Sequence, residues 1–211
     1  MGNGQISKFL RKGLFSMNFF MVGSFFMLFM LNADWASNYA VKLVGFIFFV
    51  LGTMEAADFT DAFSHIKKPA VTSAAMCAVA FAAQLLMKLL KPAAMASNII
   101  SILLFAATLY MSLNVFRMFV NALDSHRELV DDVSHIVRLQ SNFNKLAIFT
   151  IINFCGDVLN RLIPLELFTT LGGVVTAISK ILIYIFLLIL LFSFNKLRTD
   201  FDKRQERTSD Q

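Results

Sequence analysis

Six long apolar runs divide the sequence, and short polar stretches separate them. The runs lie at 14–31, 39–59, 70–90, 94–120, 146–163 and 168–194. At about 1.5 Å per residue, each is long enough to cross the roughly 30 Å hydrocarbon core of a bilayer. The runs lack the strict alternation of barrel strands, and an isolated span has to satisfy its backbone polar groups internally. The pattern therefore predicts an all-α, polytopic membrane bundle of six transmembrane helices.

The run at 146–163 is the weakest of the six. Its apolar residues favour insertion by roughly 3–6 kcal/mol, whereas Asp157 alone opposes insertion by about 2.5–3.5 kcal/mol. Without this crossing, the basic C-terminal tail would lie on the opposite side of the membrane from the basic N-terminus. We therefore interpret the run as a span that inserts as a hairpin with the last one. The alternative is a five-span protein in which this run lies at the membrane surface.

The fourth helix is expected to continue beyond the membrane. No glycine or proline occurs between Pro92 and Gly156, so nothing in the sequence breaks this helix before about Gln140. Residues 121–140 would then form a cytoplasmic, amphipathic helical extension. The apolar side chains on one side of this extension are Leu129, Val130, Val133, Ile136 and Val137.

Composition agrees with a membrane protein. Apolar residues make up 57% of the chain and charged residues 16%, against roughly 45–50% and about 25% in soluble domains. We expect residues 1–198 to form a single transmembrane domain, and 199–211 to form a polar cytoplasmic tail that frays. No polar segment interleaves basic and aromatic residues, so nucleic acid is not an expected partner.

The distribution of lysine and arginine predicts the orientation. If both termini are cytoplasmic, 14 of the 19 Lys and Arg residues lie on the cytoplasmic side, as the positive-inside rule requires. The first apolar run is longer than the roughly 7–15 residues of a cleaved signal sequence. We therefore expect a multi-pass protein with both termini in the cytoplasm, in the plasma membrane rather than in an organelle membrane.

Polar residues within the fourth and fifth spans could form a pathway through the bundle. They are Asn114, Arg117, Asn153, Asp157 and Arg161. Polar groups inside a span usually face the bundle interior or a water-filled cavity. Asp157 and Arg161 are four residues apart, a spacing at which opposite charges pair on a helix. These residues either line a path for a cation or polar solute, or pair only for structural reasons.

A second polar group follows the second span and consists of Glu55, Asp58, Asp61 and His65. At helical spacing, the last three share one face, with Glu55 beside it. Carboxylates and an imidazole on one face could ligate a divalent cation, relay protons or serve a lipid-acting enzyme. The alternative is a helix end that is simply solvated, and the sequence does not decide whether a metal binds.

Motifs of familiar enzymes are absent from the sequence. It contains no G-x-S-x-G, no H-E-x-x-H and no nucleotide-binding loop. We therefore interpret the chain as a non-enzymatic accessory or organising membrane component without a cofactor. Its spans are surrounded by the lipid bilayer, and its 121–140 helix is expected to contact a protein partner. The alternatives are a small carrier or channel for a cation or polar solute and, third, a lipid-acting membrane enzyme that uses the carboxylate and histidine group.

Overall fold

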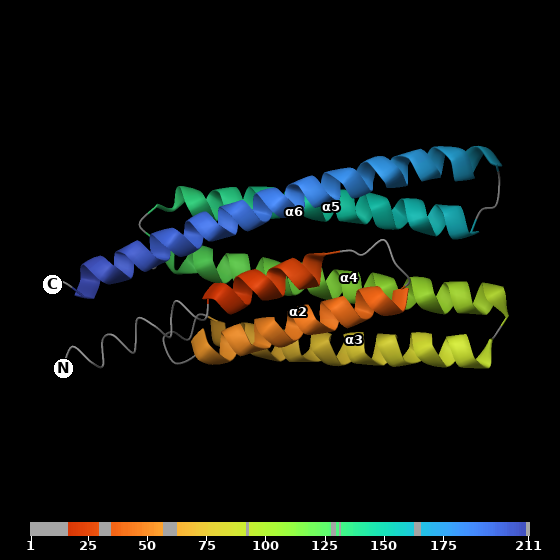
Figure 1. The fold of residues 1–211 in the computed structure, drawn as a ribbon, viewed down its shortest axis with the longest axis horizontal. Coiled ribbons are helices and arrows are strands. Elements are labelled where there is room, and N and C mark those ends of the chain that lie inside the picture. Colours follow the sequence, from red (N-terminus) through yellow and green to blue (C-terminus); the bar gives the residue numbers. More distant parts are fainter. Residues whose placement is uncertain are drawn as a thin grey trace.

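The computed structural model describes residues 17–29, 35–56, 63–91, 93–127, 130, 132–162 and 166–209. Every regular element in these residues is a helix, which confirms the all-α prediction. A short helix at Met17–Leu28 precedes α2 (Trp35–Ala56), α3 (Ser64–Leu90), α4 (Ala94–Ser125), α5 (Ser134–Leu162) and α6 (Glu166–Ser209). Successive helices run in opposite directions along the long axis of the bundle (Figure 1).

Within the described residues, four helices are long and apolar enough to cross a membrane. They are Ala36–Ala56, Ser64–Leu90, Met95–Ser125 and Gly173–Asp200. The Met17–Leu28 helix extends for only about 18 Å at about 1.5 Å per residue. The α5 helix is long, but Lys145 and Asp157 interrupt its apolar stretch. The described part of the chain is thus a membrane-type helical bundle with four candidate spans.

Aromatic packing connects the helices into one core. The closest helix pairs are α5 with α6 and α2 with α3, and α4 packs against α3 and α5 (Figure 1). The ring of Phe119 on α4 lies at the centre of the core. Ring centroids 4.6–6.0 Å from it belong to Phe20, Phe49, Phe63, Phe116 and Phe194. Such pairs contribute about 0.5–1.5 kcal/mol each beyond burial of their area.

Two glycines bring the Met17–Leu28 helix into backbone contact with α2. A Cβ atom at Gly23 would lie 2.8 Å from the Phe49 nitrogen and 2.9 Å from the Gly45 oxygen. A Cβ atom at Gly45 would lie 2.8 Å from the Met27 Cα and would also overlap the Met27 nitrogen. Only glycine permits this approach, which is the type of close crossing that small residues allow in membrane bundles.

The prediction of one continuous helix to about Gln140 is wrong. The α4 helix ends at Ser125, and residues 134–140 are instead the first turns of α5, which runs back along the bundle. The reversal buries Val130 and Ile136, two apolar residues of the predicted extension. Burying them in the core is more favourable than exposing them on a projecting helix. Leu129 lies outside the described residues.

Hydrogen bonds from polar side chains stabilise this reversal, which contains no glycine or proline. The Asp132 carboxylate accepts hydrogen bonds from the backbone amide and the hydroxyl of Ser134, each at 2.8 Å. The backbone amide of Asp132 in turn donates to the Asp200 carboxylate on α6 at 2.8 Å. Asp and Ser form such turns because their side chains bond to nearby backbone groups.

The tail, which was expected to fray from Thr199, is helical instead. The α6 helix contains 44 residues and continues to Ser209. Its length of about 66 Å, at about 1.5 Å per residue, is twice the hydrocarbon thickness of a bilayer. The last turns of α6 extend beyond the other described helices (Figure 1). The projecting element is therefore α6, not α4.

At one end of the bundle, α3 and α5 begin and α4 and α6 end (Figure 1). Several exposed lysine and arginine residues lie on these helices near that end. Phe119 contacts Phe63 and Phe194, and Phe116 contacts Phe143 at 4.6 Å, so these positions lie at similar heights. The exposed cations lie within about one and a half helical turns of these rings, at 3.6 residues per turn. They are Lys67, Lys68, Arg117, Arg138, Lys145 and Lys196, and we call this end the basic end.

Candidate functional site

A buried lysine lies between α2, α3 and α4. Lys42 on α2 is 1% exposed. Its Nζ atom stands 4.6 Å from the centroid of the Phe105 ring on α4. No hydrogen-bond acceptor for Nζ occurs among the residues that the structure describes. An ionisable group inside a membrane bundle is a functional candidate, because its burial is costly.

Polar groups from three helices surround this lysine. The Gln84 amide donates to the Ser101 hydroxyl at 2.8 Å, and the Tyr39 hydroxyl donates to the Ser101 carbonyl at 3.5 Å. Cys77 on α3 is also buried and lies near Lys42. We call this group the buried lysine site; its members are Tyr39, Lys42, Cys77, Gln84, Ser101 and Phe105.

Helical spacing brings these residues together. Tyr39 and Lys42 are three residues apart on α2, and Ser101 and Phe105 are four apart on α4, so each pair shares a helix face. Cys77 and Gln84 are seven residues apart on α3, which again places them on one face. One face each of α2, α3 and α4 carries polar residues, and these three faces meet at one place in the bundle.

The site has the chemistry of an anion or polar-group receptor. A protonated lysine has three donors, and burying it costs several kcal/mol unless they are paired. The Phe105 ring offsets part of that cost, since a desolvated cation–π contact contributes about 2 kcal/mol or more. The remaining donors could hold a carboxylate or another acceptor that enters the bundle.

The residues of the predicted polar pathway occupy different environments. Asn114 and Arg117 are exposed on α4, whereas Asn153 on α5 is 1% exposed and Asp157 is partly buried. The Asn114 amide contacts the Met118 sulfur at 3.9 Å on its own helix. In the described part of the chain, neither α4 residue bonds to α5. Arg161 belongs to α5, but its side chain lies outside the described set.

The predicted carboxylate and histidine group is only partly described. Glu55 ends up partly buried near the end of α2 and His65 is exposed at the start of α3. Asp58 and Asp61 lie outside the described residues. Among the residues that the structure does describe, no three His, Cys, Asp or Glu side chains gather as a metal site.

Sequence reasoning missed Lys42 as a site residue. The signal was present, because Lys42 is a charge within the second apolar run. Its position near the start of the run is equally typical of a lysine that reaches the membrane surface, so the sequence does not distinguish the two environments. Only the packing of α3 and α4 around α2 reveals that its ammonium group points into the bundle.

Comparison with protein-family models, with curated proteins and with solved structures found no match for this chain. The functional assignment therefore rests on the fold and on the side chains described above.

Proposed function

We propose that this chain is a non-enzymatic organising component of the plasma membrane, with six crossings and both termini in the cytoplasm. The basic end supports this orientation, because lysine and arginine at membrane boundaries favour the cytoplasmic side. Lys68 and Lys88 on α3 are separated by about 30 Å at about 1.5 Å per residue, which matches the hydrocarbon thickness.

Close pairing with α6 supports a crossing by α5 as well. Phe149 and Phe186 stack at 5.3 Å, and Asn142 donates to the Ser193 hydroxyl at 2.8 Å. Polar residues of α5 can thus be covered by a neighbouring helix instead of lipid. In this way, a helix that is too polar to insert alone enters the membrane as half of a hairpin.

The observation that carries the organising role is the length of α6. From Lys196 at the basic end to Ser209, α6 extends for about 20 Å at about 1.5 Å per residue. The hydrogen bond between Asp132 and Asp200 joins this extension to the segment between α4 and α5, within the 121–140 region. In our proposal, a protein partner docks on the α6 extension and on this region.

Site-specific photocrosslinking in native membranes tests the proposed partner. A photoreactive side chain at exposed Lys203 of α6 should form a protein adduct. The matched control is Leu188 on the same helix, which is 56% exposed at membrane depth and should label only lipid. Equal protein labelling at the two positions, or none at Lys203, would contradict the organising role.

A small carrier is the second candidate, and Lys42 is the observation that favours it. The Lys42 ammonium group has no hydrogen-bond acceptor among the described residues, and a buried group of this kind suits a polar or anionic solute that occupies the site during transport. The buried hydroxyl and amide groups of Ser101 and Gln84 would add further hydrogen bonds. The carrier therefore uses the buried lysine site rather than the pathway predicted around Asn114 and Arg117.

A screen of small carboxylates and polar solutes against the purified chain tests the carrier. A bound solute should raise the melting temperature of the wild type and leave Lys42→Met unchanged. Lys67→Gln removes an exposed charge at the basic end and should still respond. If no solute stabilises the wild type and proteoliposomes show no flux, the carrier is ruled out.

A further inference from the structure

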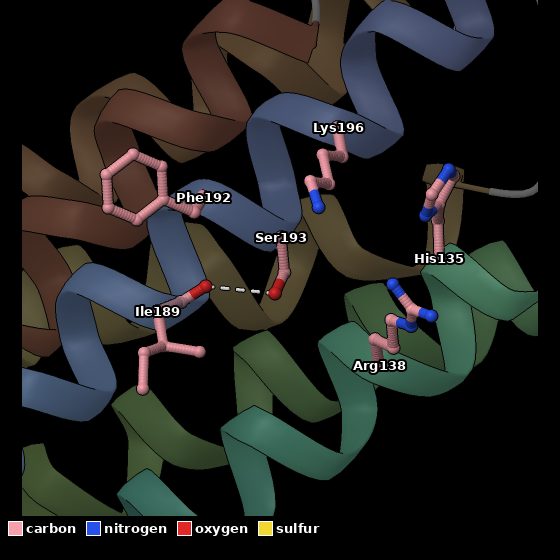
Figure 2. Close-up of a pocket in the computed structure, with 6 residues that line it drawn as sticks. All are labelled: His135, Arg138, Ile189, Phe192, Ser193 and Lys196. Carbon is pink, nitrogen blue, oxygen red and sulfur yellow. Dashed lines mark hydrogen bonds between the residues drawn. The ribbon is translucent and has the colours of Figure 1, made fainter.

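A pocket opens between α5 and α6 at the basic end. Its volume is about 190 Å³, and it is lined by His135, Arg138, Ile189, Phe192, Ser193 and Lys196. Figure 2 shows the Lys196 ammonium and the Arg138 guanidinium reaching toward a common space beside the Ser193 hydroxyl, with His135 at its edge. Pockets that enclose whole small molecules measure about 300–1,000 Å³, so this one suits a single chemical group.

The electrostatics of the pocket favour an anion. Arg138 and Lys196 are both exposed, and neither forms an ion pair with a described residue. Among the described residues, the acidic neighbours are Asp132 and Asp200. The Asp132 carboxylate lies 3.8 Å from His135 and accepts two hydrogen bonds from Ser134. The Asp200 carboxylate accepts one from the Asp132 amide. Two cations from different helices therefore converge on one space, and within the described residues neither has a carboxylate in ion-pair contact.

The pocket combines this charge with an apolar wall. Phe192 is 69% exposed and Ile189 is 38% exposed. They lie one and two turns from Lys196 on α6, about 6 and 10 Å away from the basic end at about 1.5 Å per residue. A ligand with a phosphate and a hydrocarbon chain would match both parts, because the chain could follow α6 into the apolar zone.

We propose that this pocket binds the phosphate group of an anionic phospholipid of the leaflet at the basic end. The phosphate contacts Arg138 and Lys196, since a guanidinium and an ammonium are the side chains best suited to phosphate oxygens. The Ser193 hydroxyl borders the same space but donates to the Ile189 carbonyl at 2.9 Å and accepts from Asn142 at 2.8 Å, so the two cations supply the donors for the phosphate (Figure 2). The acyl chains lie along Phe192 and Ile189. This inference rests on the pocket and on the proposed position of α6 in the membrane, and it is independent of the proposed partner.

Native mass spectrometry of the full chain in detergent tests the lipid site. Titration with phosphatidylglycerol and with phosphatidylcholine should show preferential retention of the anionic lipid. Arg138→Gln together with Lys196→Gln should weaken phosphatidylglycerol binding by at least about tenfold. The matched control, Lys67→Gln with Lys68→Gln, removes two exposed charges from α3 at the same end and should change binding by less than about threefold.

Two further arms separate a lipid from a free phosphate. Inorganic phosphate at the lipid concentration should not displace phosphatidylglycerol, and Phe192→Ser should weaken lipid binding. Displacement by inorganic phosphate, or equal losses in the α3 control and the pocket variant, would overturn the proposal. If the double variant fails to fold, the single variants Arg138→Gln and Lys196→Gln serve in its place, and unchanged lipid binding in both would also overturn it.

Discussion

Lys42 illustrates how much a single residue depends on its neighbours. On α2 alone it would be one charge near the start of an apolar helix, but α3 and α4 remove it almost fully from solvent. Its ammonium group retains the Phe105 ring as a partner, and no hydrogen-bond acceptor is found within the described residues. A buried charge of this kind reduces the stability of the folded protein. Residues that reduce stability are typical of functional sites, so Lys42 is a candidate for binding a ligand.

Replacement of Lys42 by methionine measures this cost. Methionine has a similar length and no charge, so Lys42→Met should raise the stability of the bundle by about 1–4 kcal/mol. Thermal unfolding of the purified chain in detergent provides the measurement. A large loss of stability would instead mean that the ammonium group has a strong partner in the folded protein.

Gly45 provides a second prediction at the residue scale. Gly45→Ala would press a methyl group against the backbone of the Met17–Leu28 helix, which should cost about 1–3 kcal/mol as overpacking. Gly173→Ala is the control, because a Cβ atom there meets nothing within 4 Å, and alanine improves helix propensity by up to about 1 kcal/mol. Unfolding midpoints should therefore fall for the first variant and hold or rise for the second.

At the scale of elements, the start of α5 depends on a side-chain cap. The Asp132 carboxylate satisfies the Ser134 amide, one of the backbone donors that a helix start leaves unpaired. The hydrogen bonds from the Ser134 hydroxyl and amide hold the pKa of Asp132 below its ordinary value of 3.8. The cap therefore stabilises the folded state fully above about pH 4 and is lost as pH falls through the lowered pKa.

Hydrogen exchange at the first turn of α5 tests this cap. Asp132→Ala should reduce the protection of amides 134–137 several-fold at neutral pH. In the wild type, protection factors should stay constant from pH 7 to about pH 4 and decline below that. Asp124→Ala is the control, because its carboxylate pairs with Arg127 within the preceding turn and not with α5. Equal effects of both substitutions would contradict a specific role for Asp132.

For the whole molecule, the two ends of the bundle should lie on opposite sides of the membrane. We predict that a cysteine at Lys67 reacts with a membrane-impermeant maleimide only after the membrane is opened, and that one at Lys91 reacts in intact cells. A cysteine at Leu188, exposed midway along α6, should stay unlabelled in lipid. The background for these variants replaces Cys77 and Cys155, which are both free thiols.

The same assay tests whether α5 crosses the membrane. Cysteines at Lys145 and Arg161, near the two ends of its apolar stretch, should label from opposite sides. Labelling of both positions from the same side would leave α5 at the membrane surface and the chain with five or fewer crossings.

The sequence by itself determined the class of fold and the approximate location of the apolar part of each described helix, and it predicted the side of the membrane on which charge gathers. Long apolar runs and excluded charges follow from the solvent of each segment, which is a local property. It also identified α5 as the least apolar segment, through Asp157. The sequence did not predict the reversal after Ser125. No glycine or proline marks this turn, because side-chain hydrogen bonds between Asp132 and Ser134 stabilise it instead.

Only the tertiary structure decided which polar residues face one another. Asn114 and Arg117 are exposed, whereas Asn153 and Lys42 are buried. Helical spacing predicts which residues share a helix face, but it does not predict which helix packs against that face. The convergence of Arg138 and Lys196 depends on how α5 and α6 align, which the close packing of the two helices determines. Whether a segment prefers lipid or water follows from its own residues, so the sequence predicts it. Which segments pack together depends on the complementary shapes of their side chains, which only the folded structure reveals.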